Sequence, residues 1–219
     1  IGVRLVGSEM CIRDRLLVGV AVLVIGVGIW VGWTTPFFGS SAAPEAAGIV
    51  FDDPQKIDTV QLVDHKGKQF DVARLQNRWS LIYFGFTNCP DLCPLTLTQF
   101  AKLDEELGIE PTPPIQYIFV SVDPDRDTPD RLGAYVEFFL PELIGVTGNS
   151  ADLENFASQL AVGFKAHSDK GENYPVDHSN AILLVNPAAE FQAVLTAPHT
   201  TERLAADFRA IQKWYLNSG

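Results

Sequence analysis

The sequence predicts a mixed α/β domain that is preceded by one apolar helix, and three observations support this. An uncharged run of apolar residues occupies 16–33. After it, short apolar runs typical of buried strands alternate with segments of helical periodicity, and such alternation builds a sheet with helices on both faces. A pair of cysteines, Cys89 and Cys93, directly follows the first central apolar run.

The composition of this 219-residue chain excludes several classes of protein. With 47% hydrophobic and 20% charged residues, the chain is too apolar to be disordered and too charged for a polytopic membrane protein. The formal net charge is −11, which argues against nucleic-acid binding, because phosphates require a basic surface. The three cysteines are too few for a disulfide scaffold, so cysteine chemistry depends on one pair.

The first fifteen residues look foreign to the rest of the chain. Residues 4–15 resemble a translated adaptor of a sequencing library, and the only methionine is Met10. A basic segment of a signal sequence is the alternative. We expect residues 1–15 to be non-native, which leaves Cys89 and Cys93 as the only native thiols.

Residues 16–37 are expected to form a transmembrane anchor. A helix needs about 20 apolar residues to cross a hydrocarbon core of about 30 Å. Trp30 and Trp33 lie at one end of the run, where aromatic rings favour the interface. A cleaved signal peptide is the alternative, with residues 42–44 as its cleavage site. The absence of Lys and Arg between Arg15 and Lys56 suits translocation of the following segment.

A flexible tether at 38–51 and an acidic domain at 52–219 are expected to follow the anchor. The tether is expected because its residues are small, include proline and lack periodicity. The first 51 residues carry three basic and three acidic side chains, so the whole net charge lies on the domain. Its length suffices for a single core.

The first strands of the domain are predicted from two patterns. Residues 59–63 alternate between apolar and polar and then meet a turn, so 69–72 is expected as their hairpin partner. Residues 79–86 form a nearly continuous apolar run, which is typical of a central strand buried on both faces.

Two helices and another central strand follow. Residues 96–107 carry apolar side chains at helical spacing and end at a glycine. Residues 116–122 repeat the buried-strand pattern. Residues 129–139 fit a helix with proline at its first position, capped by Asp127 or Thr128.

The last part of the domain predicts three strands and two helices. A short strand is expected at 143–146 and a helix at 151–162. Strands at 181–185 and 191–195 are separated by a hairpin-like turn. A closing helix is expected at 201–216. This order, with a cysteine pair after the first central strand, makes the thioredoxin-like fold the natural candidate.

Cys89 and Cys93 are the first candidates for chemistry. They are four residues apart, so on a helical turn both sulfurs face one point. They follow a strand and precede a helix, whose N-terminal N–H groups and dipole are expected to lower a thiol pKa. Thiolate is both a nucleophile and a ligand for soft metals, and the spacing alone does not decide between a metal site and a disulfide.

A third donor is sought among the four histidines. His65 is expected to be a solvated turn residue, His167 a polar loop residue and His199 a neighbour of a helix cap. His178 differs because it lies in a polar turn just before the buried run 181–185. In a thioredoxin-like sheet that turn lies beside the cysteine loop, so its imidazole is a candidate third ligand.

Three motifs stand out: Phe84-Gly85-Phe86-Thr87-Asn88-Cys89-Pro90-Asp91-Leu92-Cys93-Pro94, Ser121-Val122-Asp123-Pro124-Asp125-Arg126-Asp127-Thr128-Pro129, and Val176-Asp177-His178-Ser179. Together they resemble the Sco/SenC family of copper-handling proteins. The resemblance covers roughly residues 50–217. The chain departs from the family pattern at Asn180, where a small or hydroxyl residue is commoner, and in the turn at 187–190.

The resemblance implies a membrane-tethered, thioredoxin-fold protein that binds one copper ion, Cu(I) or Cu(II), through Cys89, Cys93 and His178. It further implies delivery of that copper to the dinuclear copper site of cytochrome c oxidase, with another copper chaperone or a thiol reductase as a second partner. Thiolates suit Cu(I), and an imidazole keeps Cu(II) accessible. Asp177 is expected either to orient the ring of His178 or to cap its turn.

Two further expectations concern location and the middle motif. The domain is expected on the periplasmic side of a bacterial cytoplasmic membrane, with the intermembrane-space side of the mitochondrial inner membrane as the alternative. The Asp123–Asp127 loop is interpreted as a loop and helix cap in which Arg126 pairs internally. A role in copper release or docking is its alternative.

Three other functions stay open. In the first, Cys89 and Cys93 act as a thiol–disulfide oxidoreductase without metal. In the second, they form a structural disulfide in an extracytoplasmic domain. In the third, the site binds zinc, which would require a fourth ligand for tetrahedral coordination.

Overall fold

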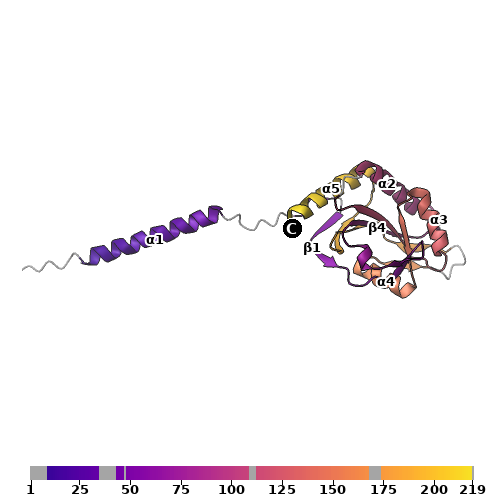
Figure 1. Cartoon of the computed structure of the whole chain (residues 1–219), viewed down its shortest axis with the longest axis horizontal. Helices are drawn as coiled ribbons and strands as arrows, with labels where there is room; N and C mark the ends of the chain where they lie inside the picture. Colours follow the sequence, from indigo (N-terminus) through magenta and orange to yellow (C-terminus); the bar gives the residue numbers. More distant parts are fainter. Residues whose placement is uncertain (1–8, 35–42, 47, 109–111, 168–173, 219) are drawn as a thin grey trace, which may run out of the picture. The chain divides into compact units, whose positions relative to one another are not determined.

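A computed structural model of the chain describes residues 9–34, 43–46, 48–108, 112–167 and 174–218 (Figure 1). It divides into two compact units, Ile1–Ser41 and Ala42–Gly219. The first unit contains the helix α1 (Glu9–Thr34). Among the residues that the structure describes, no helix has both the length and the apolar character needed to cross a membrane. The predicted transmembrane anchor and the non-native start stay predictions.

The second unit is built around a mixed sheet of eight strands in the order β1-β10-β9-β4-β5-β6-β2-β3. Strands β4, β5 and β6 are parallel, and the other neighbours pair antiparallel. A separate sheet consists of β7 and β8. The strands are β1 (Gly48–Lys56), β2 (Leu62–Asp64), β3 (Gln69–Phe70), β4 (Trp79–Gly85), β5 (Ile115–Ser121), β6 (Ile144–Thr147), β7 (Phe164–Ala166), β8 (Val176–His178), β9 (Ile182–Val185) and β10 (Glu190–Leu195).

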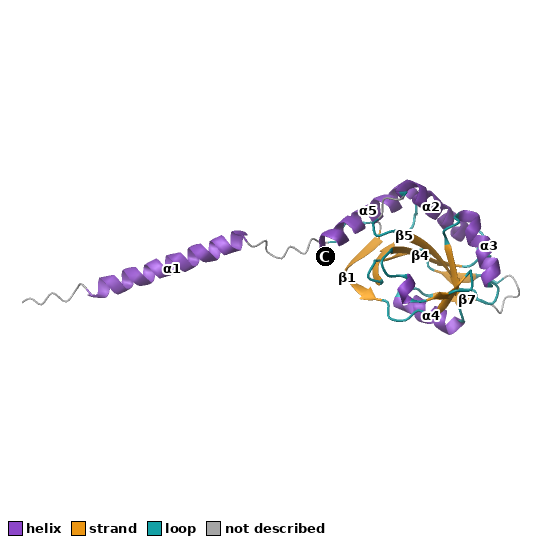
Figure 2. Ribbon diagram, viewed as in Figure 1, coloured by secondary structure: helices purple, strands orange, loops and turns teal. Residues whose placement is uncertain are grey.

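Helices cover both faces of the large sheet (Figure 2). Alternate residues of β4 point to opposite faces: Leu81 and Tyr83 pack with α2, α3 and α5, whereas Ile82 and Phe84 pack with α4. This arrangement confirms the predicted α/β class. The helices of this unit are η1 (Val72–Arg74), α2 (Leu92–Leu107), α3 (Pro129–Phe139), α4 (Ser150–Gln159) and α5 (Thr201–Ser218).

The helix that follows the cysteines begins earlier than predicted. It was expected at 96–107, but α2 begins at Leu92 and contains Cys93. Pro94 does not prevent this, because in the first turn its missing N–H would have had no partner inside the helix. The earlier start places Cys93, but not Cys89, on the helix.

The N-terminal edge of the sheet corrects the predicted tether. Residues 48–51 were assigned to the tether, but they form the first part of β1, which pairs with β10. The sequence of β1 contains two aspartates and a proline, and its register shifts between Val50 and Gln55. An irregular edge strand of this kind lacks the alternation by which strands are predicted.

Candidate metal centre

The two cysteines lie close together at the connection between β4 and α2. Cys89 lies in the loop between them, and Cys93 lies in the first turn of the helix. The N–H of Cys93 donates to Sγ of Cys89 at 3.4 Å. Gly85 leaves room for Sγ of Cys93, because a Cβ at position 85 would lie 2.6 Å from that sulfur. Both thiols are free.

His178 closes the site from β8, the last residue of which it forms. Its Nε2 lies 3.6 Å from Sγ of Cys93. Its Nδ1 lies 3.0 Å from the carbonyl oxygen of Ser179, and because a carbonyl only accepts, Nδ1 carries the hydrogen. The lone pair of Nε2 is therefore available on the side of the sulfur. The ligand atoms of Cys89, Cys93 and His178 all lie within 4.8 Å of one another.

Burial sets the protonation of two of these groups. It lowers the pKa of His178 below its ordinary value of 6.5, so the ring is neutral near neutral pH, as a metal ligand must be. Burial also raises the pKa of Cys93. The lowering expected from the helix N-terminus is therefore wrong for this thiol, because the loss of water on burial is the largest influence on its pKa.

The two sulfurs differ in accessibility, which leads to a test. Cys93 is fully buried, whereas Cys89 is half-buried. A reagent needs both access and thiolate to react. We expect iodoacetamide to modify Cys89 at least about tenfold faster than Cys93 in the metal-free native chain, as measured by peptide mass spectrometry over time. Equal rates in the native chain would contradict the buried position of Cys93, and unfolding in urea should equalise them.

The aromatic side chains around His178 were not assigned to the site from sequence. The rings of Tyr83 and Phe86 both meet the imidazole edge-on, with centroids 5.9 and 5.8 Å away. The hydroxyl of Tyr83 donates to Oδ1 of Asn180 at 2.8 Å. These residues belong to the buried run predicted as a strand, whose core role hides their contact with the histidine.

The Nδ1 of His178 donates its hydrogen bond to the carbonyl oxygen of Ser179 and not to the carboxylate of Asp177. Instead, Oδ2 of Asp177 lies 2.7 Å from Nε2 of His167. The two residues face each other from β8 and the segment after β7. The expected influence of Asp177 on His178 stays a prediction.

The remaining histidines lie outside the group of potential ligands. The expectation of a solvated His65 is wrong, because its side chain is only 5% exposed and its Nδ1 accepts from the N–H of Gly145 at 3.1 Å. The ring lies against Gly133 of α3, a tertiary contact that the turn sequence does not reveal. His199 lies before α5, with Nε2 2.7 Å from the carbonyl oxygen of Asn180.

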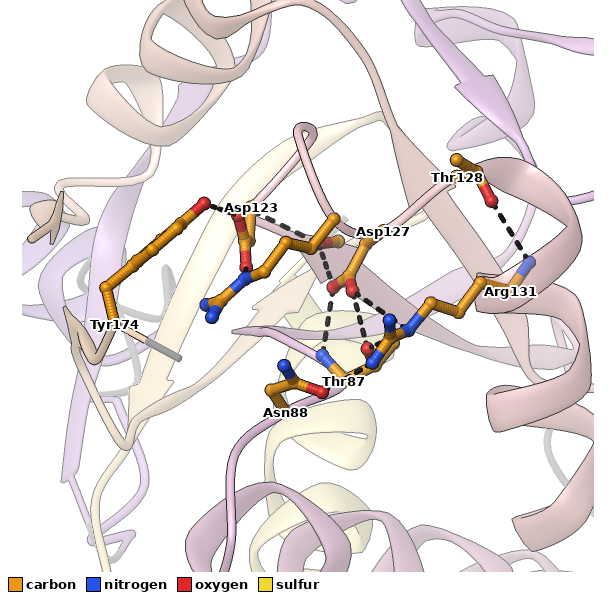
Figure 3. A network of polar contacts seen from close by, with 9 residues as sticks. Thr87, Asn88, Asp123, Asp127, Thr128, Arg131 and Tyr174 are labelled. Atoms are coloured by element: carbon orange, nitrogen blue, oxygen red, sulfur yellow. Dashed lines mark hydrogen bonds and ion pairs between the residues drawn. The ribbon is translucent and has the colours of Figure 1, made fainter. Parts of the chain in front are cut away.

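The middle motif forms the polar network of Figure 3, beside the cysteine loop. Its expected internal pair is confirmed, since Nε of Arg126 contacts the Asp123 carboxylate. Its expected cap is also confirmed, because Thr128 is the N-cap of α3 and accepts from the N–H of Arg131. The same network extends to Thr87, Asn88 and Tyr174 (Figure 3).

The family model described as SCO1/SenC matches residues 52–213. The chain belongs to the SCO1/SenC family. This confirms the resemblance carried by the three motifs. The match covers nearly the whole domain that contains the three candidate ligands.

Known relatives agree with the assignment to the SCO1/SenC family. The mitochondrial SCO2 homologue of Bos taurus is 36% identical over 150 residues, which are 68% of this chain and 56% of that protein. A putative copper-binding protein of Stutzerimonas stutzeri is 34% identical over 142 residues, 65% of this chain and 70% of its own. This Sco/SenC chain thus spans little more than half the length of its bovine relative.

A solved structure shows the same fold. The crystal structure of yeast Sco1 with copper bound superposes with a TM-score of 0.67 at 30% sequence identity, covering 73% of this chain and 90% of that one. The likeness of this Sco/SenC chain to that structure confirms the thioredoxin-like α/β fold.

Proposed function

We propose that this chain binds one copper ion through Cys89, Cys93 and His178 and delivers it during the assembly of cytochrome c oxidase. The observation that carries the proposal is the convergence of two sulfurs and one imidazole nitrogen within 4.8 Å, from segments far apart in the sequence. The copper is cargo: it is received at this site and released to a partner. The copper-bound yeast relative supports the choice of metal.

The donor set fits copper better than zinc. Two sulfurs are soft ligands that suit Cu(I), and an added imidazole also accommodates Cu(II). A structural zinc site is almost always four-coordinate, whereas the ligand group found among the described residues has three members. The burial of Cys93 keeps one sulfur away from water, and the half-buried Cys89 is the sulfur that a partner protein can reach first.

We also propose that residues 16–37 tether the domain to a membrane, on the periplasmic side in a bacterium or the intermembrane-space side in a mitochondrion. The described side chains of α1 support this, because those of Leu17, Val20, Leu23 and Trp30 are each more than half exposed. Residues 17–30 of α1 carry no charged side chain, and an apolar surface of this kind favours an apolar environment. The recipient would be the copper-site subunit of the oxidase, with a further copper chaperone or thiol reductase acting on the same site.

Thiol–disulfide exchange is the second candidate function. It is favoured by the pairing of one reachable and one buried thiol, with the N–H of Cys93 donating to Sγ of Cys89. Attack by Cys89 on a partner disulfide would give a mixed disulfide, which Cys93 would resolve by forming the Cys89–Cys93 bond. The partner's two cysteines would be reduced. This activity makes no use of His178.

Copper titration tests the proposal. The wild-type chain, titrated with Cu(I) against a chromophoric competitor, should bind one ion per chain. Cys93→Ser should lower the copper affinity at least about 100-fold, because mutating even a residue that only hydrogen-bonds to a metal ligand typically lowers metal affinity about 10–100-fold. Cys11→Ser is the matched control and should bind as wild type does. Mixing the loaded chain with a soluble domain bearing the dinuclear copper site should move copper to that domain. Wild-type affinity in Cys93→Ser would refute the site.

A further inference from the structure

The segment just before Cys89 is held by the end of the Asp123–Asp127 loop. Asp127 is 1% exposed, and its carboxylate accepts from the backbone N–H of Thr87 at 2.9 Å and from the Thr87 hydroxyl at 2.5 Å. Arg131 on α3 donates to the Thr87 hydroxyl at 3.0 Å and to Oδ1 of Asn88. The two residues that precede Cys89 are therefore both fixed from the loop and the helix that follows it (Figure 3).

The other end of the loop holds the segment that leads to His178. Asp123 is 2% exposed, and its Oδ1 accepts from the hydroxyl of Tyr174 at 2.6 Å. The guanidinium of Arg126 pairs with the same carboxylate and lies 3.6 Å from the centroid of the Tyr174 ring. Figure 3 shows Tyr174 reaching Asp123 from the side of the network that lies away from Thr87.

The loop between the two contacts is closed on itself. The N–H of Asp127 donates to the carbonyl of Asp123 at 2.9 Å. The hydroxyl of Ser121, the last residue of β5, donates to Oδ2 of Asp127 at 2.6 Å and accepts from the N–H of Asp123 at 3.2 Å. Because each end is tied to the other and to a central strand, displacing one end moves the other.

The loop supports the segment before His178, whereas the segment after it is held by the hydrogen bond from Tyr83 to Asn180. Strand β8 belongs to the separate sheet with β7, so the backbone hydrogen bonds of the eight-stranded sheet do not fix it relative to the thiols. Tyr174 lies just before β8 and is 8% exposed. Its hydroxyl joins this segment to the loop by a hydrogen bond to Asp123.

We propose that the Asp123–Asp127 loop is a brace that sets the spacing between the thiols and the imidazole. Asp127 positions the segment of Cys89, and Asp123 positions the segment of His178 through Tyr174. These are positioning residues: both oxygens of Asp127 already accept from protein donors, and neither aspartate belongs to the ligand group. The inference rests on the proposed copper function, because the spacing matters to a ligand set.

Tyr174→Phe tests the brace, since it removes one hydroxyl and keeps the ring against Arg126. We expect Cu(I) affinity to fall about tenfold, and the nitrogen splitting in the electron paramagnetic resonance spectrum of the Cu(II) form to weaken. Tyr117→Phe is the matched control, because the hydroxyl of Tyr117 is buried without a hydrogen-bond partner. It should leave both readouts unchanged. Wild-type values for Tyr174→Phe in both would overturn the brace.

A double-mutant cycle tests whether the effect passes through the imidazole. In the His178→Ala background, Tyr174→Phe should change copper affinity by less than about twofold, because coupled changes are not additive. A full tenfold loss in that background would indicate a general structural effect and overturn the proposal.

A readout without copper separates this proposal from the proposed function. In the metal-free chain, nuclear Overhauser contacts between the ring of His178 and those of Tyr83 and Phe86 should weaken in Tyr174→Phe and persist in Tyr117→Phe. If the wild-type chain binds no copper, the proposed function fails, and this comparison still decides the brace. Unchanged contacts in Tyr174→Phe would overturn it.

Discussion

Replacing His178 with alanine is expected to lower the affinity for copper by about 100-fold. Loss of a metal ligand should lower the affinity at least as much as loss of a residue that hydrogen-bonds to a ligand. The reason is the geometry of Nε2, whose lone pair is available 3.6 Å from Sγ of Cys93. Two sulfurs remain in the variant, so binding weakens without disappearing. Competition titration with Cu(I) measures the change.

The same variant separates the two candidate functions. Thiol–disulfide exchange at Cys89 and Cys93 should proceed at close to the wild-type rate in His178→Ala, because the imidazole takes no part in it. His65→Asn is the control: it removes an imidazole outside the ligand group and keeps an acceptor for the N–H of Gly145. Unchanged copper affinity in His178→Ala would exclude the three-ligand site and favour the redox function.

Asp127→Ala is expected to destabilise the domain by about 3 kcal/mol. The carboxylate accepts from Ser121 and twice from Thr87, and its side chain is fully buried. Each buried donor left without a partner costs about 1–3 kcal/mol, and part of this is recovered if water enters. Urea-induced unfolding of the wild-type chain and the variant measures the difference.

Asp125→Ala is the matched control for this prediction. Asp125 lies in the same loop but is exposed, and changes at exposed positions usually stay within about 0.5 kcal/mol. Comparable losses in Asp127→Ala and Asp125→Ala would show that the network contributes little to stability. A large loss for Asp127→Ala alone is the expected outcome.

The central strands were predicted well because their burial is recorded in the sequence itself. The runs that became β4, β5 and β9 are apolar at almost every position, since helices cover both faces of the sheet. The cap of α3 was also predictable, because Thr128 and Pro129 act within one turn of the chain.

Elements that depend on distant partners were not predicted. Strands β7 and β8 have three residues each, too few to show a period. The edge strand β1 is set by its pairing with β10, and His65 is held by a tertiary hydrogen bond from the N–H of Gly145. These tertiary partners cannot be identified from the residues on either side of each element.

The candidate site divides in the same way. The cysteine pair is visible from spacing, whereas the histidine was identified from its place before a buried strand only together with the cysteine pair and the family resemblance. The supports of the site were not visible, because Tyr83, Asp127 and Tyr174 look like core or loop residues until the contacts with Asn180, Thr87 and Asp123 are seen. The pKa of Cys93 was misjudged for a related reason, because its burial is a tertiary property.

The most direct test is an X-ray absorption spectrum at the copper K-edge of the Cu(I)-loaded wild-type chain. If Cys89, Cys93 and His178 bind the ion together, the spectrum should contain two sulfur neighbours and one nitrogen neighbour per copper. A spectrum with sulfur neighbours alone, or with nitrogen and oxygen neighbours only, would contradict this ligand set.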